Sequence, residues 1–421
     1  MKRSTERILT THSGSLIRTR AIIEGMKART INRPYDQHTL AVDIRNGIAE
    51  VVRQQVETGI DIPNDGEFGR RGFTSYIHER LSGLEPRPPD PQDFQLGPGG
   101  ERAQFPDFSE QYDKHFRFLW MHPDIDMAEV ANAPAIVERF RVTGPLRYKG
   151  QAAVQQDIAT LKAALQGLNV ADAFITAVTP TSRHSDRDVD KYYPTLQAYL
   201  YDLADAMHEE YKAITDAGFI LQCDFAALNP GAIIDRTGAL REDARKAREL
   251  AVEVLNHALR DVPEDRVRYH HCWGSNNRPH TTDTPLVEIL PQLFKIKAQA
   301  YGVESANPRH EHEWMAWKDV RLPDGKILIP GLISQSTNVV EHPELVAWRI
   351  KNFASVVGKE NVIAGVDCGF SQYWDQIRVH PTVQWAKLQA LVEGAALASR
   401  ELWGRNVADA TPAEVAVAHV S

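Results

Sequence analysis

The chain has few cysteines, no long apolar run and no excess of basic residues. Its three cysteines, Cys223, Cys272 and Cys368, are too few for a disulfide framework and are typical of a reducing cytoplasm. No stretch approaches eighteen consecutive apolar residues, and the N-terminal segment lacks the apolar core of a signal peptide. The formal net charge of −8 argues against nucleic acid as a partner. We therefore expect a cytoplasmic protein without a membrane span.

Amphipathic segments alternate with short apolar ones along most of the chain. Residues 43–58 carry apolar side chains at helical spacing, Gly59 ends this helix, and a short strand follows. Repeats of this pattern are typical of parallel βα units. We predict a (β/α)8 TIM barrel formed by residues 1–421 as one domain. Its eight core strands are expected near residues 7–14, 60–66, 172–180, 219–225, 267–273, 298–305, 327–334 and 361–368.

One region does not fit the βα pattern. Residues 84–108 are rich in proline and glycine and cannot form a barrel element. We expect an insertion over approximately residues 84–136, either as a surface segment or as a lid over the barrel mouth. The segment "ERFRVTGPL", residues 138–146, is predicted to be an extra strand outside the eight.

Chemically useful side chains collect where the predicted strands end. In such barrels the catalytic residues lie at the C-terminal ends of the strands. The residues found at these ends are His12 to Ser15, Glu67, Asp224, His270, Cys272, Glu304, Asp367 and Cys368.

The segment "YHHCWG" suggests a metal site. Residues i and i+2 of a strand point to the same face, so His270 and Cys272 can bind one ion. Cys368 ends the last strand and Glu304 ends the strand after the His-x-Cys strand. Two sulfurs, one imidazole nitrogen and one carboxylate oxygen make a tetrahedral Zn²⁺ site. The alternative is that these cysteines are small buried hydrophobes, which is the interpretation favoured for Cys223.

The charge of this ligand set indicates what the zinc would do. Two thiolates and one carboxylate carry three negative charges, which makes zinc a poor activator of water. Such a site is better suited to a third, nucleophilic thiolate, because zinc lowers the pKa of a thiol. The ligand set therefore favours attack by sulfur on an electrophilic carbon.

Several motifs occur in a familiar order. "TTHSGSLIRT", "NDGEFGR", "LQCDFAAL", "YHHCWG", "YGVESAN" and "VDCGF" resemble, at roughly the same spacing, the catalytic barrel of cobalamin-independent methionine synthase. The resemblance runs from about Leu9 to Gly404 and lacks the family's N-terminal duplicated half. It implies the barrel shared with uroporphyrinogen decarboxylase.

The resemblance also implies roles for individual residues. The family's zinc ligands fall on His270, Cys272, Glu304 and Cys368. Its backbone turn that holds the thiol amino acid is matched by Ser13, Gly14 and Ser15, and the carboxylates that meet the amino group are matched by Glu67 and Asp224. Capping or loop salt bridges are the alternative for these two carboxylates.

The chain departs from the family where the methyl donor would bind. Asp224 is followed by Phe225 and Ala226 instead of Glu-Pro, and "TPTSRHSDRD" lacks the family's folate-stacking Trp. The general-acid His falls near Ser336, which argues against methyltetrahydrofolate as donor, because a tertiary amine needs a proton to leave. An acid from elsewhere could replace it. The candidates are His184, His310 and His312. Arg18, Arg70 and Arg71 are possible anion contacts, and Arg309 or His310 has either a functional role or a place in a solvated loop.

The expected function is zinc-dependent transfer of an alkyl group, most simply methyl, from an alkyl donor to a small thiol such as homocysteine, as in 5-methyltetrahydropteroyltriglutamate–homocysteine methyltransferases. One alternative is opening of an epoxide by a zinc-bound thiolate, as in epoxyalkane:coenzyme M transferases. Others are a metal-free, decarboxylase-like enzyme and a non-catalytic thiol-binding barrel. A homo-oligomer is compatible with all of them.

Overall fold

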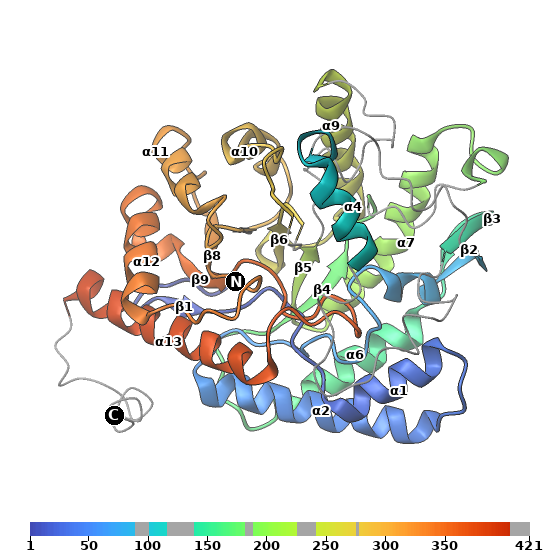
Figure 1. Cartoon of the computed structure of the whole chain (residues 1–421), viewed down its shortest axis with the longest axis horizontal. Helices are drawn as coiled ribbons and strands as arrows, with labels where there is room; N and C mark the ends of the chain where they lie inside the picture. Colours follow the sequence, from blue (N-terminus) through green and yellow to red (C-terminus); the bar gives the residue numbers. More distant parts are fainter. Residues whose placement is uncertain (89–100, 116–138, 182–187, 225–240, 275–277, 405–421) are drawn as a thin grey trace.

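A ring of parallel strands forms the centre of the structure, a computed structural model that describes residues 1–88, 101–115, 139–181, 188–224, 241–274 and 278–404. Seven strands are hydrogen-bonded in the order β1-β9-β8-β7-β6-β5-β4, and all are parallel (Figure 1). Their bounds are β1 Leu9–Thr10, β4 Phe174–Val178, β5 Ile220–Asp224, β6 Val267–His271, β7 Ala300–Val303, β8 Ile327–Ile333 and β9 Ile363–Val366.

The segment 60–64 closes the ring as its eighth member. It is not a regular strand, but Ile62 forms an isolated parallel bridge with Thr11. On its other side, the Phe174 N–H of β4 donates to the Pro63 carbonyl at 3.2 Å. The predicted (β/α)8 barrel is therefore confirmed, and each of the eight predicted strand regions contains one member of the ring.

Helices surround the ring and connect its members. α2 begins after Asp36, whose side chain accepts the His38 N–H, and ends at Gly59, which adopts a left-handed φ of 101°. The helices between ring members are α1 Arg20–Thr30, α2 Gln37–Thr58, α6 Gln151–Ala164, α7 Leu196–Asp216, α9 Arg241–Ala258, α10 Leu286–Leu293, α11 Ala316–Asp319 and α12 Pro343–Val357, and α13 Pro381–Trp403 follows β9.

The apolar core has two layers. The larger one lies between the strands and the helices, and the smaller one fills the inside of the ring. Members of the inner layer come from seven of the eight ring members: Leu9, Ile62, Phe174, Ile220, Ala300, Ile327, Ile329 and Ile363. β6 instead supplies Arg268, whose guanidinium lies 3.4 Å from the Phe174 ring centroid. This filled interior makes the C-terminal mouth of the barrel the place where a site can form.

A β-hairpin and two short helices lie outside the ring. β2 (Leu81–Arg87) pairs antiparallel with β3 (Arg139–Tyr148), the strand predicted from "ERFRVTGPL". α3 (Glu101–Gln104) and α4 (Pro106–His115) lie between these two strands in the chain, and Thr281 of the loop after β6 donates to Gln104 at 2.6 Å. Much of the predicted insertion, residues 89–100 and 116–138, lies outside the described residues.

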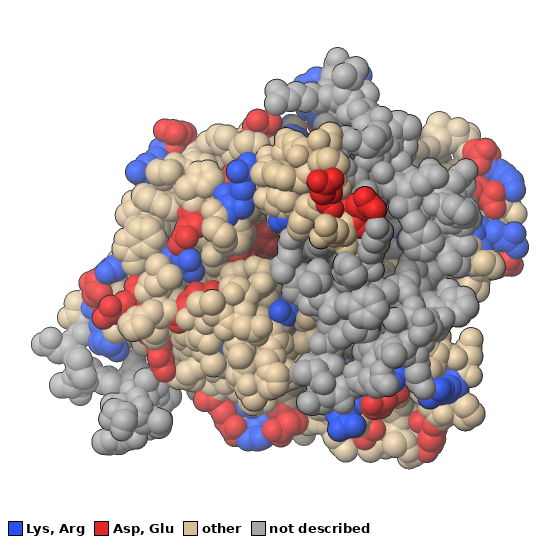
Figure 2. Space-filling view, in the orientation of Figure 1, with Lys and Arg blue, Asp and Glu red and all other residues tan. Residues whose placement is uncertain are grey.

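None of the described helices combines the length and apolar character needed to cross a bilayer. Figure 2 shows acidic and basic side chains interspersed on one face of the molecule.

Buried Glu210 of α7 anchors the hairpin to the barrel. Its carboxylate accepts hydrogen bonds from Tyr76 at 2.8 Å, from Tyr148 at 2.6 Å and from Arg80 at 3.0 Å. Burial alone would raise the pKa of Glu210, but the arginines Arg80 and Arg70 and the two hydroxyl donors outweigh it and hold the pKa below its usual value. The ion pair therefore contributes stability that is lost as the pH falls through the folded-state pKa.

We predict that Glu210→Gln lowers the free energy of unfolding by about 3 kcal/mol, because it leaves Arg80 without its buried charge partner. Chemical denaturation at pH 7 measures this change. The matched control is Glu209→Gln on the adjacent, exposed residue, which should change stability by less than about 0.5 kcal/mol. Equal effects of the two substitutions would contradict the anchoring role.

Candidate functional site

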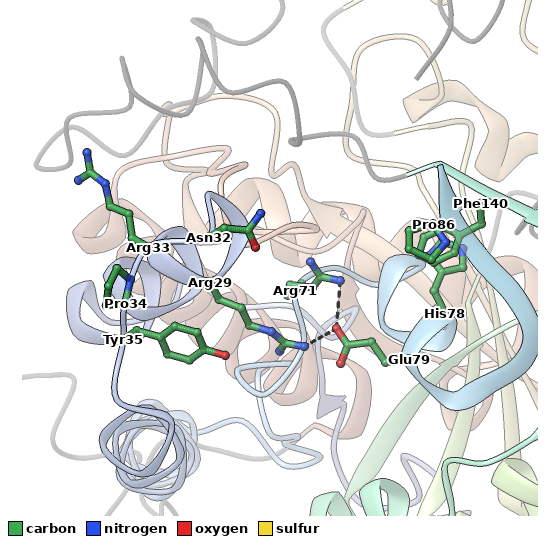
Figure 3. Close-up of a pocket in the computed structure, with 10 residues that line it drawn as sticks. All are labelled: Arg29, Asn32, Arg33, Pro34, Tyr35, Arg71, His78, Glu79, Pro86 and Phe140. Atoms are coloured by element: carbon green, nitrogen blue, oxygen red, sulfur yellow. Dashed lines mark hydrogen bonds and ion pairs between the residues drawn. The ribbon is translucent and has the colours of Figure 1, made fainter. Parts of the chain in front are cut away.

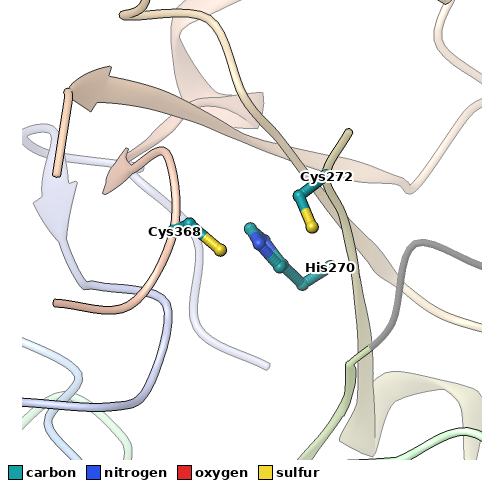
Figure 4. Close-up of side chains that lie close together, drawn as sticks. All are labelled: His270, Cys272 and Cys368. Atoms are coloured by element: carbon teal, nitrogen blue, oxygen red, sulfur yellow. The ribbon is translucent and has the colours of Figure 1, made fainter. Parts of the chain in front are cut away.

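Three side chains from two strand ends converge at the barrel mouth. His270 lies in β6, Cys272 directly follows it, and Cys368 follows β9. One ligand atom from each lies within 4.8 Å of the other two, and all three residues are buried. Figure 4 shows the His270 ring and the two sulfurs pointing toward one another. The structure thus brings together three of the four residues predicted as zinc ligands.

A glycine makes room for the imidazole. Gly302 of β7 is the register partner of His270, and a Cβ added at Gly302 would lie 3.1 Å from His270 Nδ1. On the other side, Asp224 of β5 is the register partner of His270. The side chain of His270 is therefore fixed between an acidic neighbour and a backbone without a side chain.

Glu304, the fourth predicted ligand, does not belong to this close group. It is buried at the end of β7, and its Oε2 accepts the Trp273 N–H at 3.3 Å. Burial raises the pKa of Glu304 well above its usual value, and Cys368 and Asp367 add to the shift. The carboxylate is thus adjacent to the two thiols and turned toward the backbone after Cys272.

The two thiols lie where only a cation can stabilise their charged forms. The neighbouring Cys368 thiol and burial raise the pKa of Cys272 well above its usual value, and Glu304 adds to the shift. His270 Nε2 is buried and has no hydrogen-bond partner among the described residues. An unpartnered imidazole nitrogen and two buried sulfurs form a donor set that fits Zn²⁺.

The predicted Ser-Gly-Ser turn is held next to Cys368. Ser13 Oγ donates to the Val366 carbonyl at 2.5 Å, and the Phe370 N–H donates to the Ser15 carbonyl at 2.9 Å. Gly14 has a φ of 120°, and a Cβ added there would lie 2.7 Å from Glu67 Oε1. Only glycine allows the turn to approach this carboxylate so closely.

Glu67 and Asp224 form an acidic pair near the turn. Glu67 has a left-handed φ of 59°, rare for a residue with a side chain, and Oε1 accepts the Thr176 hydroxyl at 2.9 Å. Its Oε2 is buried without a hydrogen-bond partner among the described residues. Burial raises the pKa of Glu67 to about 7 and that of Asp224 to about 6, and the charge of Asp224 adds to the Glu67 shift. Both carboxylates are poised to accept hydrogen bonds from a cationic group.

Asp367 joins two strand ends of the site. Its Oδ1 accepts the N–H groups of Ser305 and Ala306 at 2.7 and 2.8 Å, and Asn307 donates to its Oδ2 at 3.3 Å. Because Asp367 precedes Cys368 and these three residues follow Glu304, the carboxylate fixes the two segments relative to each other.

Two of the arginines considered as anion contacts are used inside the protein. Arg18 is buried and donates to the carbonyls of Glu67, Arg70 and Ser371 at 2.8, 2.8 and 3.1 Å. Arg70 donates to the carbonyl and hydroxyl oxygens of Thr176 at 2.7 and 2.9 Å. These residues position the loop that carries Glu67. His184, Phe225 and Ala226 lie outside the described residues.

Arg71 lines a hollow of about 690 Å³ away from the strand ends. Figure 3 shows Arg71 and Arg29 both turned toward Glu79, which they contact at 3.0 and 2.8 Å. The shared carboxylate partly neutralises both guanidinium groups. This hollow is larger than the cavity at the barrel mouth, but none of the residues predicted to bind zinc or the thiol lines it.

A cavity of about 320 Å³ adjoins the thiol cluster and contains a group that the sequence analysis missed. His280 lines it together with Glu304 and Asp367, and His280 Nδ1 lies 2.8 Å from Asp283 Oδ2. The spacing of a His and an Asp three residues apart, in "PHTTD", was a signal present in the sequence. The cavity itself is formed by loops that lie far apart in the chain, so this spacing alone does not predict it.

Known proteins are similar over nearly the whole chain, although no family model matches it. A methionine synthase from Sulfolobus acidocaldarius is 22% identical over 395 residues, covering 93% of each chain. The uncharacterized protein YxjH of Bacillus subtilis is 23% identical over 391 residues, covering 91% of this chain and 92% of YxjH. A solved B12-independent methionine synthase from Shewanella sp. W3-18-1, in complex with selenomethionine, has a TM-score of 0.68 and 18% identity, and the match covers 95% of this chain and 100% of that one.

The structural match supports the barrel, and the sequence relatives extend over both chains almost completely. Together with the ordered motifs, they support the resemblance of the chain to cobalamin-independent methionine synthases, in a short form with one barrel.

Proposed function

We propose that this protein catalyses the zinc-dependent transfer of an alkyl group, most simply methyl, to the thiol of homocysteine or a similar amino thiol. The observation that carries the proposal is the convergence of His270, Cys272 and Cys368 beside the buried carboxylates of Glu67 and Asp224. The His and Cys side chains suit a metal that binds sulfur, and the two carboxylates suit an ammonium group. The names of the relatives, methionine synthase, agree with methyl transfer.

The zinc would be held by His270, Cys272 and Cys368, with Glu304 as the fourth ligand. Zinc at this place would lower the pKa of an incoming thiol and so supply a deprotonated sulfur at neutral pH. Glu304 can serve as a ligand if its Oε2 gives up the hydrogen bond from the Trp273 N–H and binds the metal instead. Two thiolates around the ion favour sulfur as the nucleophile over water.

The other residues bind and orient the amino acid part of the thiol. The Oε2 atom of Glu67 and the Asp224 carboxylate would accept hydrogen bonds from its ammonium group, which gives both carboxylates the cation that their burial requires. The Ser13–Ser15 turn, held to β9, lies next to Cys368 and would fix the backbone of the amino acid. Holding both reactants in the buried mouth lowers the entropic cost of their reaction.

We predict about one zinc ion per purified chain and its loss in Cys368→Ala, because that substitution removes one of two sulfur ligands. Elemental analysis measures the zinc, and metal-edge X-ray absorption should report one additional sulfur neighbour after homocysteine is added. Cys223→Ala is the matched control, since Cys223 is a buried cysteine that is absent from the cluster. It should retain the metal.

Folded protein that contains no zinc would exclude the proposed mechanism and favour a metal-free relative. If zinc gains no sulfur neighbour from homocysteine but gains one from coenzyme M, the proposed activation of a thiol by zinc would stand, and the thiol substrate would be a different one. In that case an epoxide becomes the electrophile to test.

A second prediction concerns Glu67. Glu67→Gln should raise the KM for homocysteine about 30-fold, because it removes a charge-assisted hydrogen bond to the ammonium group worth about 2 kcal/mol. In the unmodified protein, the KM should fall as the pH rises through the Glu67 pKa of about 7, since only the deprotonated carboxylate binds the cation. Steady-state kinetics with homocysteine as the varied substrate measures both effects.

The control uses the substrate instead of the protein. 4-Mercaptobutyrate has the carbon chain and thiol of homocysteine but no amino group, so Glu67→Gln should leave its KM unchanged. An equal effect of the substitution on both thiols would show that Glu67 acts on the structure of the site and does not bind the ammonium group.

A further inference from the structure

A layer of polar side chains lies inside the barrel, one level closer to the N-terminal ends of the strands than the candidate site. It consists of Thr176, Gln222 and Arg268, which are register partners on β4, β5 and β6. Side chains two residues apart in a strand point to the same face, so Gln222 lies below Asp224 and Arg268 lies below His270. Each member of this polar layer is only 2% exposed. Buried polar groups are costly unless they are hydrogen-bonded, so their partners indicate what the layer does.

Gln222 connects the polar layer to two parts of the proposed thiol site. Its Nε2 donates to the Ser13 carbonyl at 2.9 Å and to Asp224 Oδ2 at 3.2 Å. Its Oε1 accepts the Arg268 Nε–H at 2.7 Å. Because both hydrogens of the amide nitrogen are used on these acceptors, loss of the amide would release the Ser13–Ser15 turn and the Asp224 carboxylate together.

Arg268 determines how the Gln222 amide is turned. A guanidinium group has donors but no acceptor, so the atom of Gln222 that faces Arg268 Nε must be the amide oxygen. Arg268 is itself fixed, because Nη1 donates to Thr11 at 3.0 Å and Nη2 donates to the His12 carbonyl at 2.9 Å. The amide nitrogen is therefore directed toward the two acceptors of the site.

The second carboxylate of the site is held from the same layer. The Thr176 hydroxyl donates to Glu67 Oε1 at 2.9 Å. Glu67 is thus bound to the polar layer through Thr176, and Asp224 is bound to it through Gln222. Hydrogen bonds of this kind fix the direction in which a carboxylate meets its ligand. The polar layer therefore supports both groups that we propose to bind the ammonium group.

We propose that Gln222, oriented by Arg268, is a positioning residue that makes the site prefer thiols with an ammonium group. The inference rests on the function proposed above and adds the residue that sets its preference for an amino thiol. Gln222 acts through Asp224, whose carboxylate it holds in place, and through the carbonyl of Ser13. The first contact affects only thiols with an ammonium group, whereas the second affects every thiol that uses the turn.

The experiment compares two thiols on the zinc-loaded full-length protein. Calorimetric titration measures the Kd of homocysteine and that of 4-mercaptobutyrate, which lacks the amino group. The unmodified protein should bind homocysteine at least about 30-fold more tightly. Gln222→Met should raise the Kd of homocysteine about 30-fold and that of 4-mercaptobutyrate about threefold, because only homocysteine uses the aligned Asp224 carboxylate.

A double-variant cycle tests whether Gln222 acts through Asp224. Asp224→Ala should by itself remove most of the preference for homocysteine. When Gln222→Met is added to this variant, the Kd of both thiols should change by the same factor of about three, since the carboxylate that Gln222 positions is no longer there.

Gln222→Glu is a second variant that keeps an acceptor for Arg268 and so preserves the interior contact. It places a carboxylate against Asp224 in place of a donor, and the repulsion should lower the preference for homocysteine at least about tenfold. Gln299→Met is the matched control, because Gln299 directly precedes β7, at the end of the barrel opposite the mouth. It should change neither Kd.

Four outcomes would overturn the assignment of Gln222. Equal losses for both thiols, with zinc retained, would show that Gln222 only supports the fold. An unchanged Kd of homocysteine in Gln222→Glu would exclude a positioning role. Additive effects in the cycle would show that Gln222 does not act through Asp224, and equal affinities of the unmodified protein for both thiols would show that it has no such preference. Absence of zinc, or of thiol binding, in the unmodified protein would instead contradict the proposed function itself, and the assignment with it.

Discussion

The burial of acidic groups at the barrel mouth is the constraint on which the rest of the site depends. Glu67, Asp224 and Glu304 are all removed from water, and burial raises the pKa of each. Cys272 and Cys368 add two groups whose charged forms are equally costly there. The buried arginines of the barrel donate mainly to other protein groups: Arg268 to Gln222, Thr11 and His12, Arg70 to Thr176, and Arg18 to backbone carbonyls. Such a site is most stable when ligands bring the missing positive charge, and a metal ion and an ammonium group would each supply part of it.

The fold positions these groups through the register of its strands. Asp224, His270 and Gly302 are register partners on β5, β6 and β7, so an acid, an imidazole and an open space lie side by side at one level. The loops above this level are held by Asp367, which binds the backbone after Glu304, and by Arg18, which binds the backbone around Glu67. The residues that we propose to contact a ligand are thus different from those that hold the loops in place.

The sequence predicted the ring and the level of the site well, because both follow from local pattern. Apolar runs followed by glycine or acidic residues located all eight ring members and the ends that carry Glu67, His270 and Cys368. It predicted the orientation of side chains less well. Glu304 turns toward the Trp273 backbone, and Arg18 is used to bind carbonyls, since both depend on contacts between segments far apart in the chain. The cavity lined by His280 was not predicted for the same reason: Asp283, the partner of His280, is local, but the cavity is formed by loops from other parts of the chain.

Two buried carboxylates connect the thiol cluster to the cavity beside it. Glu304 accepts the N–H of Trp273, which follows Cys272, and Asp367 accepts the backbone N–H groups of Ser305 and Ala306, which follow Glu304. Both carboxylates also line the cavity of about 320 Å³. Under the proposed function, a reactant in this cavity would lie next to a thiol bound at the cluster. Because the same two side chains contact the segments that carry Cys272 and Cys368, a change at the cluster would also change the lining of the cavity.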